Sequence, residues 1–137
     1  MRSYLEEVVA RGRLELIEEL ARDDIIDEAN QVFGGPPGIK GLVAHAKGFR
    51  RNIGNLEITI ERIVGSEHSV MAWWRFTGLH IGPWLNRPPT NNPISGSVFS
   101  FFDLVDDRIS RYRLFLHAEF PEQVIFDTSR PDPLSTL

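Results

Sequence analysis

The first half of the chain carries apolar residues at helical spacing. Over residues 3–22 they recur every three to four positions, and Gly12 interrupts the pattern at a cost of about 1 kcal/mol against alanine. This predicts two helices that meet near Gly12. A further short helix is expected over residues 23–30, and the GGPP segment at 34–37 ends regular structure. Residues 38–54 predict a longer amphipathic helix. One side of this helix carries Leu42, His45, Ala46 and Phe49.

The second half of the chain alternates apolar and polar residues with the two-residue period of half-buried strands. The segments with this pattern are residues 56–64, 69–79, 94–105 and 108–120. Helices followed by a run of strands are typical of an α+β protein, in which one antiparallel sheet bends over the helices and buries its concave face. We therefore expect a single domain over residues 1–120, followed by a loose C-terminal tail over residues 121–137.

A long loop, GLHIGPWLNRPPTNNPI at residues 78–94, separates two of the predicted strands. Its prolines fix φ and reduce the entropy lost on ordering, so we expect a stiff loop at one rim of the sheet or against a partner subunit. Trp84 would then contact a ligand, a neighbouring chain or a helix of its own subunit. His80 is interpreted as structural rather than catalytic.

Composition narrows the possible functions. The 137 residues are 42% hydrophobic and 25% charged, which is ordinary for one globular domain. The net charge of −4 and the lack of a basic block argue against a nucleic-acid partner. The chain has no cysteine, which excludes disulfides, thiolate nucleophiles and cysteine-bound zinc. Its four histidines lack ligand spacing, so we expect no metal.

Hydropathy also predicts the compartment. The N-terminal segment is charged and lacks the apolar stretch of a signal peptide, and no apolar run is long enough to cross a bilayer. We expect a cytoplasmic protein without a membrane partner.

Four local motifs, in this order along the chain, resemble one family. They are ARGRLELIEELARDDIIDEA at 10–29, GGPPGIKG at 34–41, the long loop at 78–94 and FFDLVDDRISRYR at 101–113. Together they resemble the SnoaL-like polyketide cyclase or ester-cyclase-like branch of the NTF2-like superfamily, from about Ala10 to about Ala118. The resemblance implies a cone, with a curved antiparallel sheet wrapped over N-terminal helices around a deep pocket. It also implies a homodimer or homotetramer, and cofactor-independent aldol cyclisation, hydrolysis or isomerisation of a small molecule.

The resemblance implies site positions, and this chain departs from them. In the cyclases the segment that ends here at Glu28 commonly ends in histidine. The last strand commonly carries Glu, Trp and Asp, with the Asp as acid/base, and the corresponding positions here are Arg111, Arg113 and His117. An acid and an imidazole are both retained, with their positions exchanged.

The strand period puts Arg111, Arg113, Phe115 and His117 on one face of the last strand, and the resemblance points that face into the cone. Histidine transfers protons near neutral pH, and an adjacent carboxylate fixes its tautomer. This leads to the hypothesis that His117 is a general base paired with Glu28 or Asp27. The alternative is that His117 only forms a hydrogen bond at the end of the strand.

Further residues are assigned to the pocket wall or to charge pairing. Two arginines on one buried face need counter-charges, so we expect Arg111 and Arg113 to pair with Glu57 and Glu61, or otherwise to bind an anionic substrate group or lie at a dimer interface. The predicted substrate-binding residues are Arg113, Arg111, Trp74, Phe115, Ser100 and Phe102. Trp73 and Trp74 are adjacent and point to opposite sides, and family register favours Trp74 inside the cone.

Three functions are compatible with these patterns. The first is a cofactor-independent enzyme acting on a small apolar oxygenated metabolite of polyketide type, a cyclase, isomerase or hydrolase that works by general acid/base catalysis. The second is a non-catalytic small-molecule-binding or assembly module that uses the same cone. The third is an epoxide hydrolase, which needs Asp27 or Glu28 with Arg113 around one water molecule.

Overall fold

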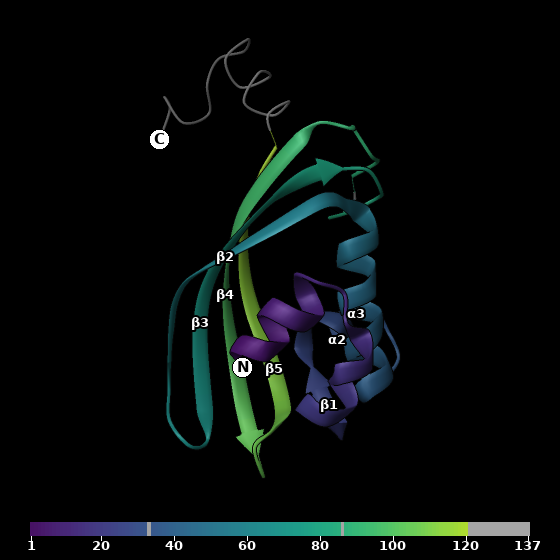
Figure 1. Ribbon diagram of the computed structural model, residues 1–137. Helices are drawn as coiled ribbons and strands as arrows, with labels where there is room; N and C mark the ends of the chain where they lie inside the picture. The colour runs from purple at the N-terminus through teal and green to yellow at the C-terminus, as the bar shows by residue number, and fades with distance from the viewer. Residues whose placement is uncertain (33, 86, 121–137) are drawn as a thin grey trace, which may run out of the picture.

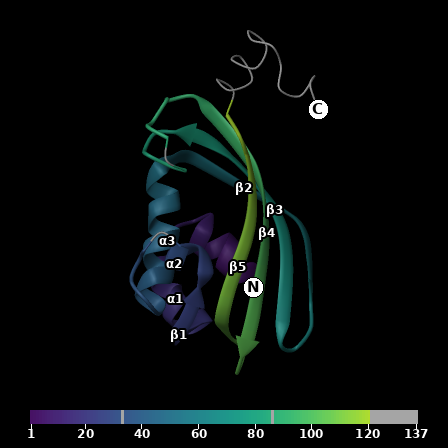
Figure 2. The same cartoon turned by 180° about the vertical axis from the view of Figure 1, so that it is seen from behind.

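The computed structural model describes residues 1–32, 34–85 and 87–120, so the tail predicted over 121–137 lies outside the described residues. A strongly curved sheet holds helices against its concave face, and opposite views show α1, α2 and α3 on the same side of it (Figure 1; Figure 2). The helical segments are η1 (Tyr4–Val9, a π-helix), η2 (Leu14–Leu16, a 3₁₀-helix), α1 (Ile17–Leu20), α2 (Glu28–Val32) and α3 (Ile39–Asn52).

The sheet has five strands in the order β1-β5-β4-β3-β2. They are β1 (Ala21–Asp27), β2 (Ile53–Gly65), β3 (Ser69–His80), β4 (Pro93–Val105) and β5 (Arg108–Glu119). β2 to β5 form an antiparallel meander, and β1 pairs parallel with β5 at the edge. The predicted α+β class, with a curved antiparallel sheet over N-terminal helices, is confirmed.

The prediction of a helix over residues 23–30 is wrong, because most of this segment forms β1. Ala21 and Ile25 are buried, and Asp27 lies opposite Tyr112 of β5. A short apolar run is ambiguous between helix and strand, and here the backbone of β5 supplies pairing that local propensity does not reveal. The pairing places Asp27 and Tyr112 side by side, which matters for the site described below.

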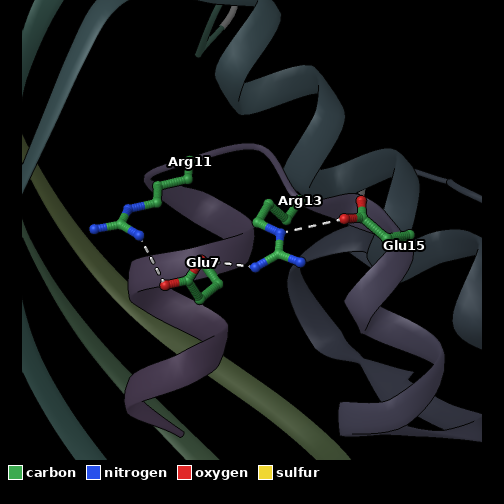
Figure 3. Close-up of polar contacts among 4 residues, drawn as sticks. All are labelled: Glu7, Arg11, Arg13 and Glu15. Atoms are coloured by element: carbon green, nitrogen blue, oxygen red, sulfur yellow. Dashed lines mark hydrogen bonds and ion pairs between the residues drawn. The ribbon is translucent and has the colours of Figure 1, made fainter.

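The N-terminal helices do meet at a turn around Gly12, as predicted. Gly12 has φ +76°, a conformation that glycine adopts without strain. Arg50 of α3 closes the turn, because its Nη1 donates to the carbonyls of Val9 and Ala10 at 2.7 and 2.6 Å. Surface ion pairs link Glu7 to Arg11 and Arg13, and Arg13 to Glu15 (Figure 3).

The core lies between the concave face of the sheet and the helices. Even-numbered residues of β3 and β4 point inward, as do Tyr112, Leu114 and Leu116 of β5. Helical residues pack against them. Fully or almost fully buried members of this core include Leu5, Val8, Ile17, Leu42, Ala72, Trp74, Phe76, Val98 and Phe102.

Candidate functional site

A cavity of about 780 Å³ opens between the concave face of the sheet, α3 and the loop after β3. Its wall is mostly apolar and aromatic. The apolar lining includes Phe49, Trp74, Pro83, Trp84, Leu85, Val98, Leu114 and Leu116. A cavity of this size and character accommodates one small, largely apolar molecule.

The loop forms one wall of this cavity. Trp84 and Arg87 exchange backbone hydrogen bonds of 3.0 Å, which closes a tight turn. The Trp84 ring lies 5.7 Å from Phe49 of α3 and 5.6 Å from Phe76 of β3, and Asn52 accepts backbone hydrogen bonds from the loop start. Trp84 therefore contacts a helix of its own subunit while it lines the cavity.

The cavity contains a histidine–carboxylate pair. His45 of α3 lines the cavity, and its Nδ1 lies 2.6 Å from Oδ2 of Asp27. The Asp27 side chain is 2% exposed and that of His45 is 29% exposed. An ionised carboxylate only accepts hydrogen bonds, so contact with ionised Asp27 selects the tautomer in which Nδ1 donates and Nε2 has the free lone pair.

Asp27 is held in place from two directions. It ends β1 and directly precedes α2, and its Oδ1 accepts a hydrogen bond from the backbone N–H of Asn30 at 3.2 Å. This is the geometry of a helix N-cap, which aspartate favours because its side-chain oxygen satisfies an orphan amide. One carboxylate oxygen thus caps α2 while the other orients His45.

Two buried tyrosines lie beside this pair. The Tyr112 ring is 6.1 Å from His45, 5.9 Å from Tyr4 and stacked at 4.8 Å on Phe102. Burial raises the pKa of the Tyr4 hydroxyl well above its usual range, and the neighbouring Tyr112 and Asp27 add to the rise. Burial also raises the pKa of Tyr112; a hydrogen bond with Ser100 partly opposes this rise, and Asp27 adds to it. Both groups are therefore neutral phenols at physiological pH. We refer to Asp27, His45, Tyr4 and Tyr112 as the polar cluster.

The structure places His117 outside the cone. Its side chain is 76% exposed, and its Nε2 lies 3.8 Å from Oε1 of Glu119. The expectation that this face of β5 points into the cone is wrong, and the expected pairs of His117 with Glu28 or Asp27 are not formed. The register of β5 against β4, with Leu116 opposite Val98, instead turns the apolar alternate residues inward.

Arg111 and Arg113 lie on the same outer face. Arg111 Nη1 donates to Glu28 Oε2 at 2.9 Å, and Arg113 Nε lies 3.7 Å from that oxygen. Arg113 also lies 3.9 Å from Asp103. The expected pairing with Glu57 and Glu61 is wrong, because both belong to β2 and the sheet order puts β4 and β3 between β5 and β2.

The remaining predicted substrate-binding residues divide between the two faces. Trp74 lines the cavity, Ser100 is buried between Trp74 and Tyr112, and Phe102 is buried beneath the Tyr112 ring. Phe115 is 67% exposed on the outer face, so it does not reach the cavity. A substrate contact by Trp74 stays a prediction.

His45 was missed from the sequence as a site residue. It lies on the same side of its helix as Leu42, Ala46 and Phe49, and a lone polar residue on an apolar helix face was the available signal. His80 is fully buried and its Nδ1 lies 3.2 Å from Thr90 Oγ1, so it has a structural contact in the loop.

A family model for the SnoaL-like polyketide cyclases matches residues 1–117. The chain belongs to the SnoaL-like polyketide cyclase family. Solved structures of this family show the same NTF2-like fold. A SnoaL-like polyketide cyclase from Agrobacterium tumefaciens C58 aligns with a TM-score of 0.73 at 16% identity, covering 93% of this chain and 92% of that one.

Two other solved structures have the same fold. A proposed SnoaL-like polyketide cyclase from Jannaschia sp. CCS1 aligns with a TM-score of 0.71 at 22% identity, over 93% of this chain and 88% of that one. IdmH from Streptomyces antibioticus, a proposed polyketide cyclase, aligns with a TM-score of 0.64 at 19% identity, over 92% and 94%. No curated protein matches the chain in sequence.

Two searches of the described residues were negative. Residues 1–32, 34–85 and 87–120 contain no group of three or more His, Cys, Asp or Glu side chains arranged to hold a metal ion. Within the same ranges, no helix combines the length and the apolar character needed to span a membrane.

Proposed function

We propose that this family member is a cofactor-independent enzyme that performs general acid/base chemistry on a small, largely apolar, oxygenated molecule. The observation that carries the proposal is the 2.6 Å contact between His45 Nδ1 and Asp27 Oδ2 in the cavity. A histidine oriented by a buried carboxylate is a common general base. The family assignment supports a substrate of polyketide type.

The reaction step that fits this pair is removal of a proton from a carbon next to a carbonyl. The C–H bond breaks, its proton passes to His45 Nε2, and its electron pair forms the enolate. The imidazolium formed is stabilised by Asp27, which stays ionised. The enolate can then attack a second carbonyl in an aldol cyclisation, or be reprotonated elsewhere in an isomerisation.

Deuterium exchange tests the proposed base without knowledge of the natural substrate. The protein is incubated in D₂O with 1-tetralone and with benzoylacetone, and loss of the α-proton signal is followed by NMR. We expect exchange above the buffer rate in the unaltered protein. His45→Gln should reduce it at least 100-fold, and Asp27→Asn should reduce it by 10²–10⁴-fold because the tautomer is no longer fixed.

His117→Gln is the matched control, since it makes the same side-chain change on the outer face of the sheet. It should leave the exchange rate unaltered. Full exchange by the His45→Gln protein would contradict the proposal. Tight binding of both ketones without any exchange would favour the non-catalytic binding module instead.

The epoxide hydrolase alternative receives less support. It needs a carboxylate and Arg113 around one water molecule, but Arg113 lies on the outer face with Glu28, where both side chains are more than a third exposed. Asp27, by contrast, bonds to His45 within the cavity. The pair of Arg113 and Glu28 is therefore exposed outside the cavity, and the buried Asp27 is engaged by His45 instead of Arg113.

A further inference from the structure

Three buried side chains next to the cavity form a chain of hydrogen bonds. Trp74 Nε1 lies 2.9 Å from Ser100 Oγ, and Ser100 Oγ lies 2.9 Å from the Tyr112 hydroxyl. The indole N–H is only a donor, so it donates to Ser100. Ser100 is fully buried and, among the residues that the structure describes, its oxygen has Trp74 and Tyr112 as its hydrogen-bonding partners.

The second bond joins two hydroxyl groups, and either of them can be its donor. Ser100 and Tyr112 therefore have two hydroxyl protons for one hydrogen bond, so one of these protons is left without an acceptor in the described part of the chain. Ser100 is fully buried and Tyr112 lines the cavity, so the phenolic proton is the one that a ligand can reach, and Ser100 then donates to the oxygen of Tyr112. A buried donor without an acceptor costs about 1–3 kcal/mol, and a ligand oxygen removes that cost.

Tyr112 is positioned to present this proton to a ligand. Its ring lines the cavity 6.1 Å from His45, and stacking on Phe102 at an interplanar angle of 5° holds the ring in place. Its raised pKa keeps it protonated, so it remains a donor at physiological pH. The hydrogen bond from Ser100 also polarises the phenol, which strengthens the bond it donates onward.

We propose that the Tyr112 hydroxyl, oriented by the Trp74–Ser100 chain, is the binding site for a carbonyl oxygen of the ligand. The site places that oxygen beside the imidazole of His45. When His45 takes a proton from the adjacent carbon, negative charge develops on this oxygen and the hydrogen bond from Tyr112 strengthens. The role in enolate formation rests on the proposed function, whereas the binding of a carbonyl oxygen does not.

The experiment compares two ligands that differ by one oxygen. 1-Tetralone has a carbonyl acceptor, and tetralin has the same ring skeleton without it. Infrared difference spectra of bound 1-tetralone should show the carbonyl stretch at lower wavenumber than in water-free solvent. Tyr112→Phe should abolish this shift and weaken 1-tetralone binding roughly five- to tenfold, the loss expected for one hydrogen bond, with tetralin binding unaltered.

Tyr4→Phe is the matched control, because it deletes the neighbouring phenol oxygen and leaves Tyr112 in place. It should preserve the carbonyl shift. A shift retained in Tyr112→Phe, or lost in Tyr4→Phe, would overturn the proposal.

The chain contains two tyrosines. If Tyr112→Phe does not fold, 3-fluorotyrosine labelling therefore gives two ¹⁹F signals that the Tyr4→Phe variant assigns. 1-Tetralone, and not tetralin, should then move the Tyr112 signal, and an unmoved signal would also overturn the proposal.

The two proposals fail separately. If the carbonyl shift depends on Tyr112 but His45→Gln leaves deuterium exchange unaltered, the proposed carbonyl site stands and the proposed role of His45 as base is refuted. If deuterium exchange depends on His45 but Tyr112→Phe leaves the carbonyl shift unaltered, the proposed carbonyl site is refuted and the proposed base stands.

Discussion

At the residue scale, Asp27 connects the fold to the proposed chemistry. It caps α2 through Oδ1, orients His45 through Oδ2, and its charge contributes to the raised pKa of both buried tyrosines. A change at this position therefore affects stability and proton transfer together. For this reason Asp27→Asn, which keeps an oxygen acceptor for the cap, is a more informative variant than Asp27→Ala.

The tyrosines of the polar cluster predict a loss of stability in alkali. Below the ordinary tyrosine pKa of about 10, both the folded and the unfolded chain keep these phenols protonated, so their contribution to the free energy of unfolding is complete. Above it the unfolded chain releases protons that the folded chain retains. The free energy of unfolding should then fall by about 1.4 kcal/mol per pH unit for each buried tyrosine, until the folded pKa is reached.

Urea unfolding at pH 9, 10.5 and 11.5 measures this slope. Tyr112→Phe should make the free energy of unfolding fall less steeply with pH, by the contribution of one tyrosine, and Tyr4→Phe should do the same. Equal slopes in the unaltered protein and in a variant that carries both Tyr4→Phe and Tyr112→Phe would show that the pKa values of the two tyrosines are not raised.

The sequence allowed the presence of an acid–histidine pair to be predicted, but not its members. Asp27 was named as a candidate partner of His117, whereas in the structure it pairs with His45. His117 was chosen because a family position was carried over, although the apolar residues Leu114 and Leu116 on the opposite face of that strand indicated which side packs inward. His45 reaches Asp27 across 18 positions in sequence, and that contact depends on how α3 docks.

At the element scale, the strands β2 to β5 and the helix α3 were predictable because their patterns are long and regular. β1 was not, because its seven residues gain their structure from pairing with β5 and carry a mixed pattern of burial. Because residues 23–30 were predicted as a helix, the parallel pairing with β5 that brings Asp27 next to Tyr112 was not predicted either. Local periodicity does not encode such a pairing between segments far apart in sequence.

Two glycines give opposite predictions for the same substitution. Gly12 joins the N-terminal helices at φ +76°, where a Cβ would lie 2.6 Å from Arg50 Nε. Gly12→Ala should lower the free energy of unfolding by about 1–2 kcal/mol, because alanine is strained in this conformation. Gly48 lies within α3, where an added Cβ would meet no side chain or distant backbone atom within 4 Å. Gly48→Ala should therefore raise the free energy of unfolding by about 0.5–1 kcal/mol.

Chemical denaturation of the two variants side by side tests both signs. Far-ultraviolet circular dichroism confirms that each keeps its helix content. A stabilised Gly12→Ala protein would mean that the turn does not require the left-handed conformation.

At the scale of the whole molecule, the outer face of the sheet is apolar along one band. Trp73 and Phe99 stack in parallel at 5.9 Å and are 37% and 41% exposed, and Phe115 lies next to Phe99 in the register of β4 and β5. A contiguous exposed aromatic band is typical of an interaction surface. We expect it to bind a second copy of this chain, which gives the homodimer expected from the sequence.

The charges beside this band favour self-association in one orientation. On β5, Arg111 and Glu119 lie four residues on either side of Phe115 and on its face of the strand. A two-fold axis across the strands at Phe115 would set Arg111 of each copy opposite Glu119 of the other, as an isologous interface requires. An axis along the strands would give neither residue such a partner.

Sedimentation equilibrium tests the dimer. The unaltered protein should sediment as a dimer at micromolar concentration, and Phe115→Glu should convert it to a monomer because one new carboxylate from each copy would then face the other at the axis. Ile81→Glu is the matched control, since Ile81 is 47% exposed but lies in the loop after β3. It should leave the dimer intact. The dimer expectation is refuted if the unaltered protein is monomeric at hundreds of micromolar, or if Phe115→Glu remains dimeric, because the face that carries Phe115 would then have no part in assembly.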